Sequence, residues 1–269
     1  MKDNKLHIIR KKRGFFKVIY PILMTVLTYL PILMVVIYSF NGSRISSVWS
    51  GFSLKWYSQL FRDDAIFEAL GNSLILALAS SLIAAVIATS AALFIGRAKL
   101  PFKWAVEKMS LAPLIIPEII LGMVFLAFFS LLGLPFGMIS LIIAHTAFCI
   151  PYVYNQVKAR LEVMDNTAVE AARDLGASPM KAFLTVTLPM LMPAIVSGMF
   201  LSFAMSFDDV IISIFVTGVD VNTLPIIVYT SLKTGVTPKI NAICTLMLGV
   251  TVICYVIAGI IGRKTKDKK

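Results

Sequence analysis

Six apolar stretches follow one another along the chain, separated by short polar segments. Each holds roughly 20 residues, the length of helix that crosses a hydrocarbon layer of about 30 Å. The predicted spans are residues 18–40, 74–95, 109–132, 137–154, 191–216 and 240–261. Lipid offers no hydrogen-bond partners, so each span must satisfy its own backbone, and unbroken apolar runs exclude a barrel, whose strands alternate. The pattern therefore predicts an all-α integral membrane protein with six transmembrane helices.

Small residues in the second predicted span recur every four positions, at Ser80, Ala84, Ala88, Ala92 and Gly96. This spacing places them on one stripe of a helix, where small side chains let a neighbouring helix approach closely. We expect the stripe to pack inside the bundle, and favour this over a specific dimer seam.

The composition excludes a soluble enzyme. Hydrophobic residues make up 58% of the chain and charged residues 14%, against about 45–50% and about 25% in soluble domains. The net charge of +11 comes from short clusters between apolar runs, so it indicates membrane topology and no nucleic-acid partner. Cys149, Cys244 and Cys254 all lie in apolar runs, the last two too far apart on one predicted helix for a disulfide.

Lysines and arginines concentrate on one side of the predicted bundle. Seven lie in residues 1–17, four in the connection 96–108, four in the connection 155–190 and five in residues 263–269. The alternate connections hold the remaining five. Because basic residues accumulate on the cytoplasmic side, both termini are predicted to be cytoplasmic, with Asn41–Ser73 on the outer face.

The basic segment 1–17 and the apolar run after it superficially resemble a signal peptide. The run has 23 uncharged residues, longer than the about 7–15 of a signal sequence, so a retained first span is expected. The predicted organisation is a cytoplasmic N-terminus (1–17), a membrane domain (18–262) and a basic cytoplasmic tail (263–269).

The connection 158–189 is the longest cytoplasmic segment between spans, and its residues predict two short helices. A Thr-x-x-Glu capping box at Thr167–Glu170 starts the first helix and Gly176 ends it. Ser178–Pro179 starts the second helix, since proline is tolerated at the first helical position, and Pro189 ends it. The expected structure is a helix–turn–helix hairpin at the membrane surface.

This hairpin resembles the EAA loop of ABC importer permeases, whose pattern is E-A-A-x3-G-x9-I-x-L-P. The matching residues are Glu170, Ala171, Ala172, Gly176, Leu188 and Pro189, and Val186 stands where isoleucine is usual. The match at six of seven fixed positions implies a type I ABC importer permease with a MetI-like bundle. In that family the loop docks into a groove of a separate ATPase subunit. An amphipathic hairpin resting on lipid headgroups is the alternative.

No G-x4-G-K-[ST] phosphate-binding loop occurs in the sequence, and Gly262–Thr265 lacks the required spacing. The resemblance therefore implies a non-catalytic transport subunit without a cofactor of its own. ATP and Mg would be bound by the partner ATPase.

Three acids lie within the predicted spans, Glu118, Asp208 and Asp209, and no basic residue lies at that depth. A carboxylate there costs about 2.5–3.5 kcal/mol, so such residues face a cavity or a partner, and their sign favours a cationic ligand. The alternatives are a protonated, hydrogen-bonded Glu118 and an aspartate that caps a broken helix. His145 is expected to be a packed neutral residue, and no cluster of ligand types predicts a metal site.

Four polar residues of the fifth predicted span, Ser202, Ser206, Asp209 and Ser213, recur at steps of four, three and four. This spacing puts them on one helical face, which is expected to line the cavity. Asp208 lies about 100° away, so it either turns inward through a helix break or needs a partner from another chain. Periodicity therefore ranks Asp209 above Asp208.

Nearly the whole chain is similar to permease subunits of spermidine/putrescine importers. Ser202–Val210 matches, as do Trp56–Tyr57 and Gly235–Pro238, whereas residues 1–17 and the second span match least. Glu118 stands at the family's intramembrane acid as a same-charge variant. The substrate pathway is predicted to include Asp209, Asp208, Glu118, Ser206 and Trp56. For Trp56 two roles stay open, a cation–π contact with an ammonium group and an anchor at the membrane interface.

The resulting hypothesis is the permease of a bacterial ABC importer that moves polyamines across the cytoplasmic (inner) membrane. It implies a homologous second permease subunit, two ATPase subunits and an extracytoplasmic polyamine-binding protein as partners. The alternatives are an ABC permease for another cationic or small organic solute, and a proton-coupled secondary carrier that uses the same carboxylates.

Overall fold

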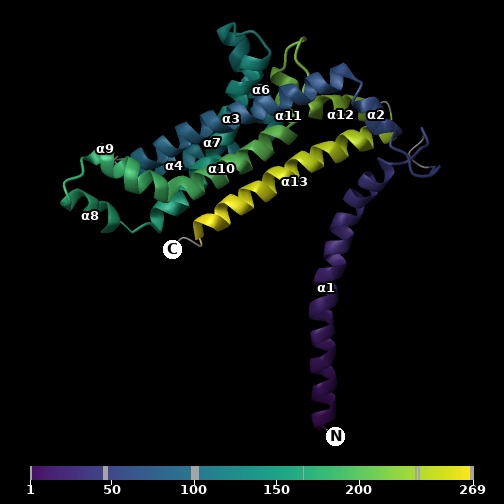
Figure 1. Ribbon diagram of the computed structural model, residues 1–269, viewed down its shortest axis with the longest axis horizontal. Coiled ribbons are helices and arrows are strands. Elements are labelled where there is room, and N and C mark those ends of the chain that lie inside the picture. The colour runs from purple at the N-terminus through teal and green to yellow at the C-terminus, as the bar shows by residue number, and fades with distance from the viewer. Residues whose placement is uncertain are drawn as a thin grey trace. The chain divides into compact units, whose positions relative to one another are not determined.

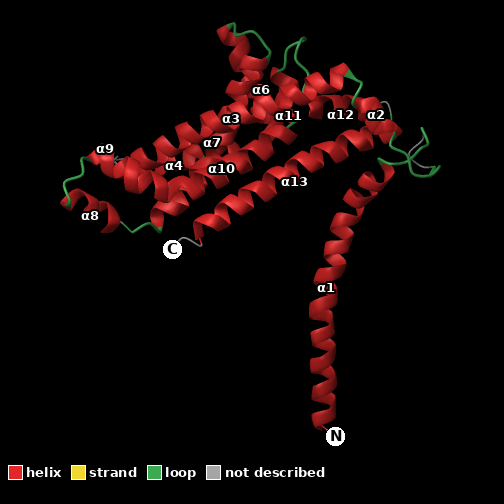
Figure 2. Ribbon diagram, in the orientation of Figure 1, coloured by secondary structure: helices red, strands yellow, loops and turns green. Residues whose placement is uncertain are grey.

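The computed structural model describes residues 2–44, 48–97, 103–165, 167–233, 235 and 237–266. Parts of the connection 96–108, of Gly235–Pro238 and of the tail 263–269 lie outside these ranges. Within them all regular elements are helices (Figure 2). Five helices are long and apolar enough to span a membrane, at Ile19–Tyr38, Asp64–Gly96, Met138–Glu162, Pro179–Asp208 and Pro238–Ile257, and Glu118–Leu131 is a shorter apolar helix. These six coincide with the predicted spans, and the all-α membrane class is confirmed.

The chain forms two compact units. The first comprises Met1–Arg62 and Thr234–Leu246, and the second comprises Asp63–Lys233 and Met247–Lys269. The first holds α1 (Lys2–Tyr38) and α2 (Lys55–Leu60), and α13 (Pro238–Lys266) contributes to both. The single membrane domain over 18–262 stays a prediction.

Three long helices form the core of the second unit. They are α3 (Asp64–Arg97), α7 (Met138–Glu162) and α10 (Leu188–Asp208), which lie side by side (Figure 1). The small residues predicted to allow close approach are buried in α3, at Ser80, Ala84, Ala88 and Ala92, whereas Gly96 is exposed. The predicted packing stripe is therefore confirmed over its first four residues.

Helices α7 and α10 contact each other in a repeating register. The Cys149 thiol donates to the Ser202 carbonyl (3.5 Å) and the Ser202 hydroxyl donates to the Cys149 carbonyl (3.2 Å). Four residues further along α7 and four back along α10, a Cβ on Gly198 would lie 2.8 Å from the Val153 Cα. Gly198 is thus required for the backbones to meet, and the pairing fixes the position of α10 along α7.

Two of the predicted spans are interrupted. The third (109–132) contains the end of α4 (Lys103–Ser110), α5 (Ala112–Ile115) and α6 (Glu118–Leu132). The fifth (191–216) contains most of α10 and, after a break, α11 (Ile211–Val216), and α12 (Leu224–Leu232) follows it. Pro117 stands directly before α6 in an extended conformation, because proline has no N–H to continue the preceding helix. The predictions of one continuous helix over 109–132 and over 191–216 are therefore wrong.

Candidate functional site

The break between α10 and α11 is centred on Asp209. Its backbone is extended (φ −69°, ψ 128°), so the N–H groups of the first turn of α11 have no partner within a helix. The Asp209 carboxylate accepts from the N–H groups of Ile212 (3.3 Å) and Ser213 (3.0 Å) and from the Ser213 hydroxyl (3.1 Å). Asp209 therefore caps α11, one of the two alternatives that the sequence left open.

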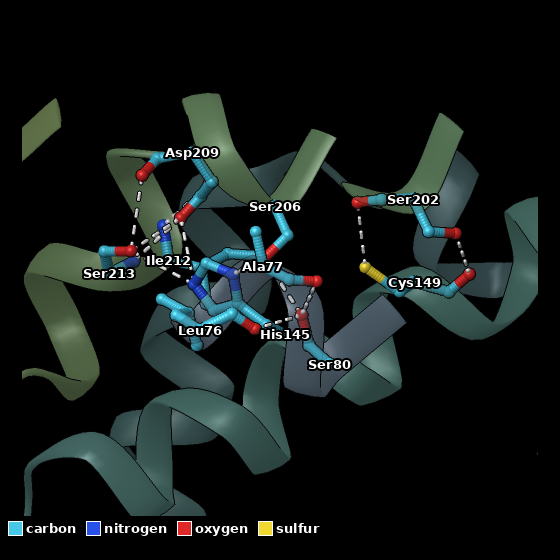
Figure 3. A network of polar contacts seen from close by, with 10 residues as sticks. All are labelled: Leu76, Ala77, Ser80, His145, Cys149, Ser202, Ser206, Asp209, Ile212 and Ser213. Atoms are coloured by element: carbon cyan, nitrogen blue, oxygen red, sulfur yellow. Dashed lines mark hydrogen bonds and ion pairs between the residues drawn. The ribbon is translucent and has the colours of Figure 1, made fainter. Parts of the chain in front are cut away.

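A buried polar network surrounds this cap (Figure 3). His145 of α7 lies between the two sides of the break, with Nδ1 2.8 Å from the Ser206 hydroxyl and Nε2 3.0 Å from the Ser213 hydroxyl. Nε2 also lies 3.4 Å from Oδ2 of Asp209, and the Ser206 hydroxyl lies 3.0 Å from that of Ser80 in α3. The network thus joins four helices.

The three acids of the spans differ in their exposure. The Asp209 side chain is only 4% exposed, whereas Asp208 at the end of α10 is exposed and Glu118 at the start of α6 is partly exposed. Of these three acids, Glu118 and Asp208 are therefore the two that are accessible in this chain.

The predicted polar face is present but it faces inward. Ser202, Ser206, Asp209 and Ser213 are all buried and hydrogen-bonded. Because the helix breaks after Asp208, 3.6-residue periodicity no longer applies beyond that residue. The break places Asp209 inside the network and leaves Asp208 exposed, which reverses the accessibility expected from the periodicity.

Trp56 belongs to a closed loop in the first unit. Its ring is 7% exposed, its Nε1–H donates to the Asn41 carbonyl (2.6 Å), and the Lys55 Nζ lies 5.4 Å from the ring centroid. The Tyr57 and Ser39 hydroxyls are 2.7 Å apart. Trp56 therefore ties the end of the first span to the start of α2, and its face already has a cationic neighbour.

Replacing Trp56 with phenylalanine should loosen this loop. The change removes the indole donor and leaves the Asn41 carbonyl unpaired, which costs about 1–3 kcal/mol when buried. We expect tryptic cleavage after Lys55 in intact membranes to accelerate about fivefold or more. Trp49, in the same loop with a 48% exposed ring, provides the control. Equal cleavage rates in Trp56→Phe and Trp49→Phe would contradict the role of the indole donor.

The predicted helix–turn–helix hairpin begins with α8 (Thr167–Asp174) and turns at Gly176 into α9 (Pro179–Ala182). Gly176 has φ +85°, its N–H donates to the Arg173 carbonyl, and the Ala177 N–H donates to that of Ala172. These two bonds form the Schellman motif that ends helices at glycine. The predicted stop at Gly176 is confirmed, as is the start at Pro179, where the Ser178 hydroxyl accepts from the Lys181 N–H.

The outer limits of the hairpin differ from the prediction. Asp165, and not Thr167, supplies the first cap, because its carboxylate accepts from both the N–H and the hydroxyl of Thr167. Pro189 does not end the second helix: α9 runs through a π-helical turn, η1 (Phe183–Thr187), directly into α10. Pro189 then lies in the first turn of α10, where a missing N–H is tolerated.

The hairpin carries both a hollow and exposed apolar side chains. A hollow of about 440 Å³ is lined by Val169, Glu170, Arg173, Pro179, Ala182, Phe183 and Thr187. The Leu175 side chain is 90% exposed and that of Met180 66%, and Ala171 is exposed while Ala172 is partly buried. Exposed apolar side chains beside a hollow are typical of a surface that a protein partner covers.

Sequence reasoning missed the bridging position of His145. It correctly expected a packed side chain, and His145 is fully buried, but it gave the residue no partners. The available pattern was the four-residue step from His145 to Cys149 on α7, which matches the step from Ser206 back to Ser202 on α10.

Comparison with known proteins identifies relatives over almost the whole chain. Residues 88–267 match the family model described as "Binding-protein-dependent transport system inner membrane component". The putrescine transport system permease protein PotI of Escherichia coli (strain K12) is 39% identical, with 98% of this chain and 96% of the relative covered. The spermidine/putrescine transport system permease protein PotC of Haemophilus influenzae is 37% identical, with 94% and 96% covered.

Solved structures share the fold. A chain of the bacterial alginate ABC transporter in complex with an alginate pentasaccharide-bound periplasmic protein superimposes with a TM-score of 0.74 at 16% identity, over 96% of each chain. A chain of the inward-facing MetNI methionine ABC transporter gives 0.61 at 19% identity, over 80% of this chain and 99% of that one. These likenesses confirm the predicted MetI-like type I permease fold.

Proposed function

This chain belongs to the binding-protein-dependent transport system inner membrane components, and we propose from that membership that it is the permease subunit of an ATP-driven polyamine importer. The observation that supports polyamines as the cargo is the sequence identity to putrescine and spermidine/putrescine permeases, which is 39% and 37% over nearly the full length. The predicted spans contain three acids and no basic residue at the same depth, and such carboxylates suit a polyvalent cation.

Within this proposal the exposed acids form the substrate pathway and the buried ones support it. Asp208 and Glu118 offer carboxylates to the ammonium groups of the cargo, while Asp209 and Ser206 hold the break beside them. Trp56 acts on the outer loop and not directly on the cargo, because its ring is enclosed. Two acids at different places let a multivalent cation pass between weak sites.

The hairpin supplies the link to ATP hydrolysis. Its exposed Leu175 and Met180, with the hollow next to Glu170, form the surface that an ATPase subunit covers. The full assembly consists of this chain, a homologous second permease, two ATPase copies and an extracytoplasmic polyamine-binding protein. ATP and Mg are bound by the ATPase copies, so this chain needs no cofactor.

Uptake measurements test the proposal directly. Vesicles containing the assembled transporter and the binding protein should accumulate labelled putrescine or spermidine only with internal ATP. Accumulation should survive an uncoupler that collapses the proton gradient. Uptake that stops with the uncoupler at constant ATP would indicate a proton-coupled carrier, and ATP-driven uptake of another solute with no polyamine uptake would replace the cargo.

The proposed orientation puts both termini and the hairpin in the cytoplasm. Single cysteines at Ser178 and Ser58, both exposed, should react with a membrane-impermeant thiol reagent from opposite sides. In intact cells we expect labelling at Ser58→Cys and not at Ser178→Cys, with both labelled after permeabilisation. Labelling of both sites in intact cells would contradict the proposed topology.

A further inference from the structure

His145 is the one side chain from α7 that reaches both sides of the α10–α11 break among the residues of this network. Its Nδ1 meets Ser206 before the break, and its Nε2 meets Ser213 after it. A second contact from α7 secures the far end of α11, where the Ser140 hydroxyl donates to the Val216 carbonyl (2.9 Å). Helix α7 therefore holds α11 at its beginning and at its end.

The hydrogen bonds fix the direction in which donors point. The Ser213 hydroxyl donates to Asp209 Oδ2, so its oxygen lone pairs are free to accept from Nε2–H of His145. A neutral imidazole with its proton on Nε2 has an acceptor at Nδ1, which accepts a hydrogen bond from the Ser206 hydroxyl. In this arrangement the chain of donors ends at the Asp209 carboxylate, which accepts three hydrogen bonds from α11 without any ligand.

Asp208 is in the opposite situation. It is the last residue of α10, it directly precedes the capping residue Asp209, and it is exposed. Helix α10 below it is fixed on α7 by the Cys149–Ser202 pair and by the close approach at Gly198. With α10 fixed on one side and α11 clamped on the other, the direction of the Asp208 side chain depends on the geometry of the break.

We infer that His145 is a positioning residue for transport: by bridging Ser206 and Ser213 across the break, it holds Asp208 in the substrate pathway. This role rests on the proposed function, in which Asp208 meets the cationic cargo. His145 itself does not contact the cargo, because its side chain is fully buried.

The test measures the position of residue 208 separately from transport. In the assembled transporter, with Cys244 and Cys254 replaced by serine, an Asp208→Cys substitution reports the water accessibility of this position to a small thiol reagent. We expect His145→Leu to lower its labelling rate about fivefold or more, because the break loses its fixed geometry. The buried native Cys149, one turn along α7 from His145, should stay unreactive.

Thr146→Val is the matched control, because Thr146 is the next residue, is buried, and its hydroxyl has no hydrogen-bond partner among the residues that the structure describes. It should leave both labelling and uptake near wild type, while His145→Leu lowers uptake about tenfold. Two polar variants keep the test decisive if His145→Leu does not assemble. Glutamine places its amide near the Nε2 position, which contacts Ser213 beyond the break, and asparagine places its amide near the Nδ1 position. Glutamine should therefore retain more of the labelling at 208 than asparagine.

Three results would overturn the inference. They are unchanged labelling at 208 in all His145 variants that assemble, exposure of Cys149 in parallel with the change at 208, and a residue 208 that does not label even beside the native His145. The labelling needs no cargo, so it remains interpretable if the wild-type transporter proves not to carry polyamines. In that case the proposed function fails and the position of residue 208 is still decided.

Discussion

A Gly176→Asp variant is expected to reach the membrane in normal amounts and to lose transport completely. Gly176 is the turn residue of the Schellman motif at the end of α8, with φ +85°. A side chain at such a φ costs roughly 1–2 kcal/mol, too little by itself to stop a transporter. A Cβ at this position has no neighbour within 4 Å among the described residues of this chain, so an aspartate would project outward, into the surface that we propose the ATPase covers. The measurements are co-purification of the ATPase and its stimulated ATP hydrolysis.

Gly133 provides a control with the same backbone geometry. It has φ +64° at the end of α6, its N–H donates to the Ser130 carbonyl, and the Leu134 N–H donates to that of Phe129. A Cβ there also has no neighbour within 4 Å. Gly133→Asp therefore carries a similar backbone cost away from the hairpin, and uptake should stay within about threefold of wild type. If both variants lost transport to the same extent, backbone strain would be the cause and docking would not be supported.

The parts of the fold that follow from local rules could be predicted from the sequence. Six apolar runs gave the helices in the correct order, and Gly176 and Pro179 gave hairpin boundaries, because glycine with positive φ and proline at a first turn are dictated by a few neighbouring atoms. Pro189 was assigned wrongly by the same local rule. Proline is tolerated both after a helix and in its first turn, and only the preceding π turn decides between the two.

The substrate-pathway residues were harder to order, because burial depends on tertiary packing. The periodicity of Ser202, Ser206 and Asp209 was real, yet it extrapolated a helix past the residue where α10 ends. An aspartate inside an apolar run is compatible with a helical ligand site and with a helix cap. What distinguishes them is that the N–H groups of Ile212 and Ser213 donate to the Asp209 carboxylate, and no spacing in the sequence reveals these bonds.

Removing the charge of Asp208 should lower polyamine uptake. The effect should be larger than that of removing the charge of an exposed acid that lies outside the pathway. Opposite unit charges about 4 Å apart attract by about 4 kcal/mol at an effective dielectric constant near 20, and exposure reduces this. We expect Asp208→Asn to lower the uptake rate about tenfold to a hundredfold, equivalent to about 1.4–2.8 kcal/mol. Asp208→Glu keeps the charge and should recover part of the rate. The measurement is initial uptake in vesicles with equal amounts of assembled complex.

Asp220 supplies the matched surface control, because it is an exposed acid in the turn after α11, and Asp220→Asn should leave uptake near wild type.

Glu118→Gln should lower uptake by an amount similar to Asp208→Asn. If both carboxylates meet the same moving cation, the double variant should lose less than the product of the two single effects, since residues that share a partner are not additive. Asp209→Asn is expected to act differently, by reducing the amount of assembled complex, because an amide in place of the carboxylate presents N–H groups to the donors of Ser213 and His145. Wild-type uptake in both Asp208→Asn and Glu118→Gln would show that these acids do not form the pathway, and the cargo would then rest on similarity to the polyamine permeases alone.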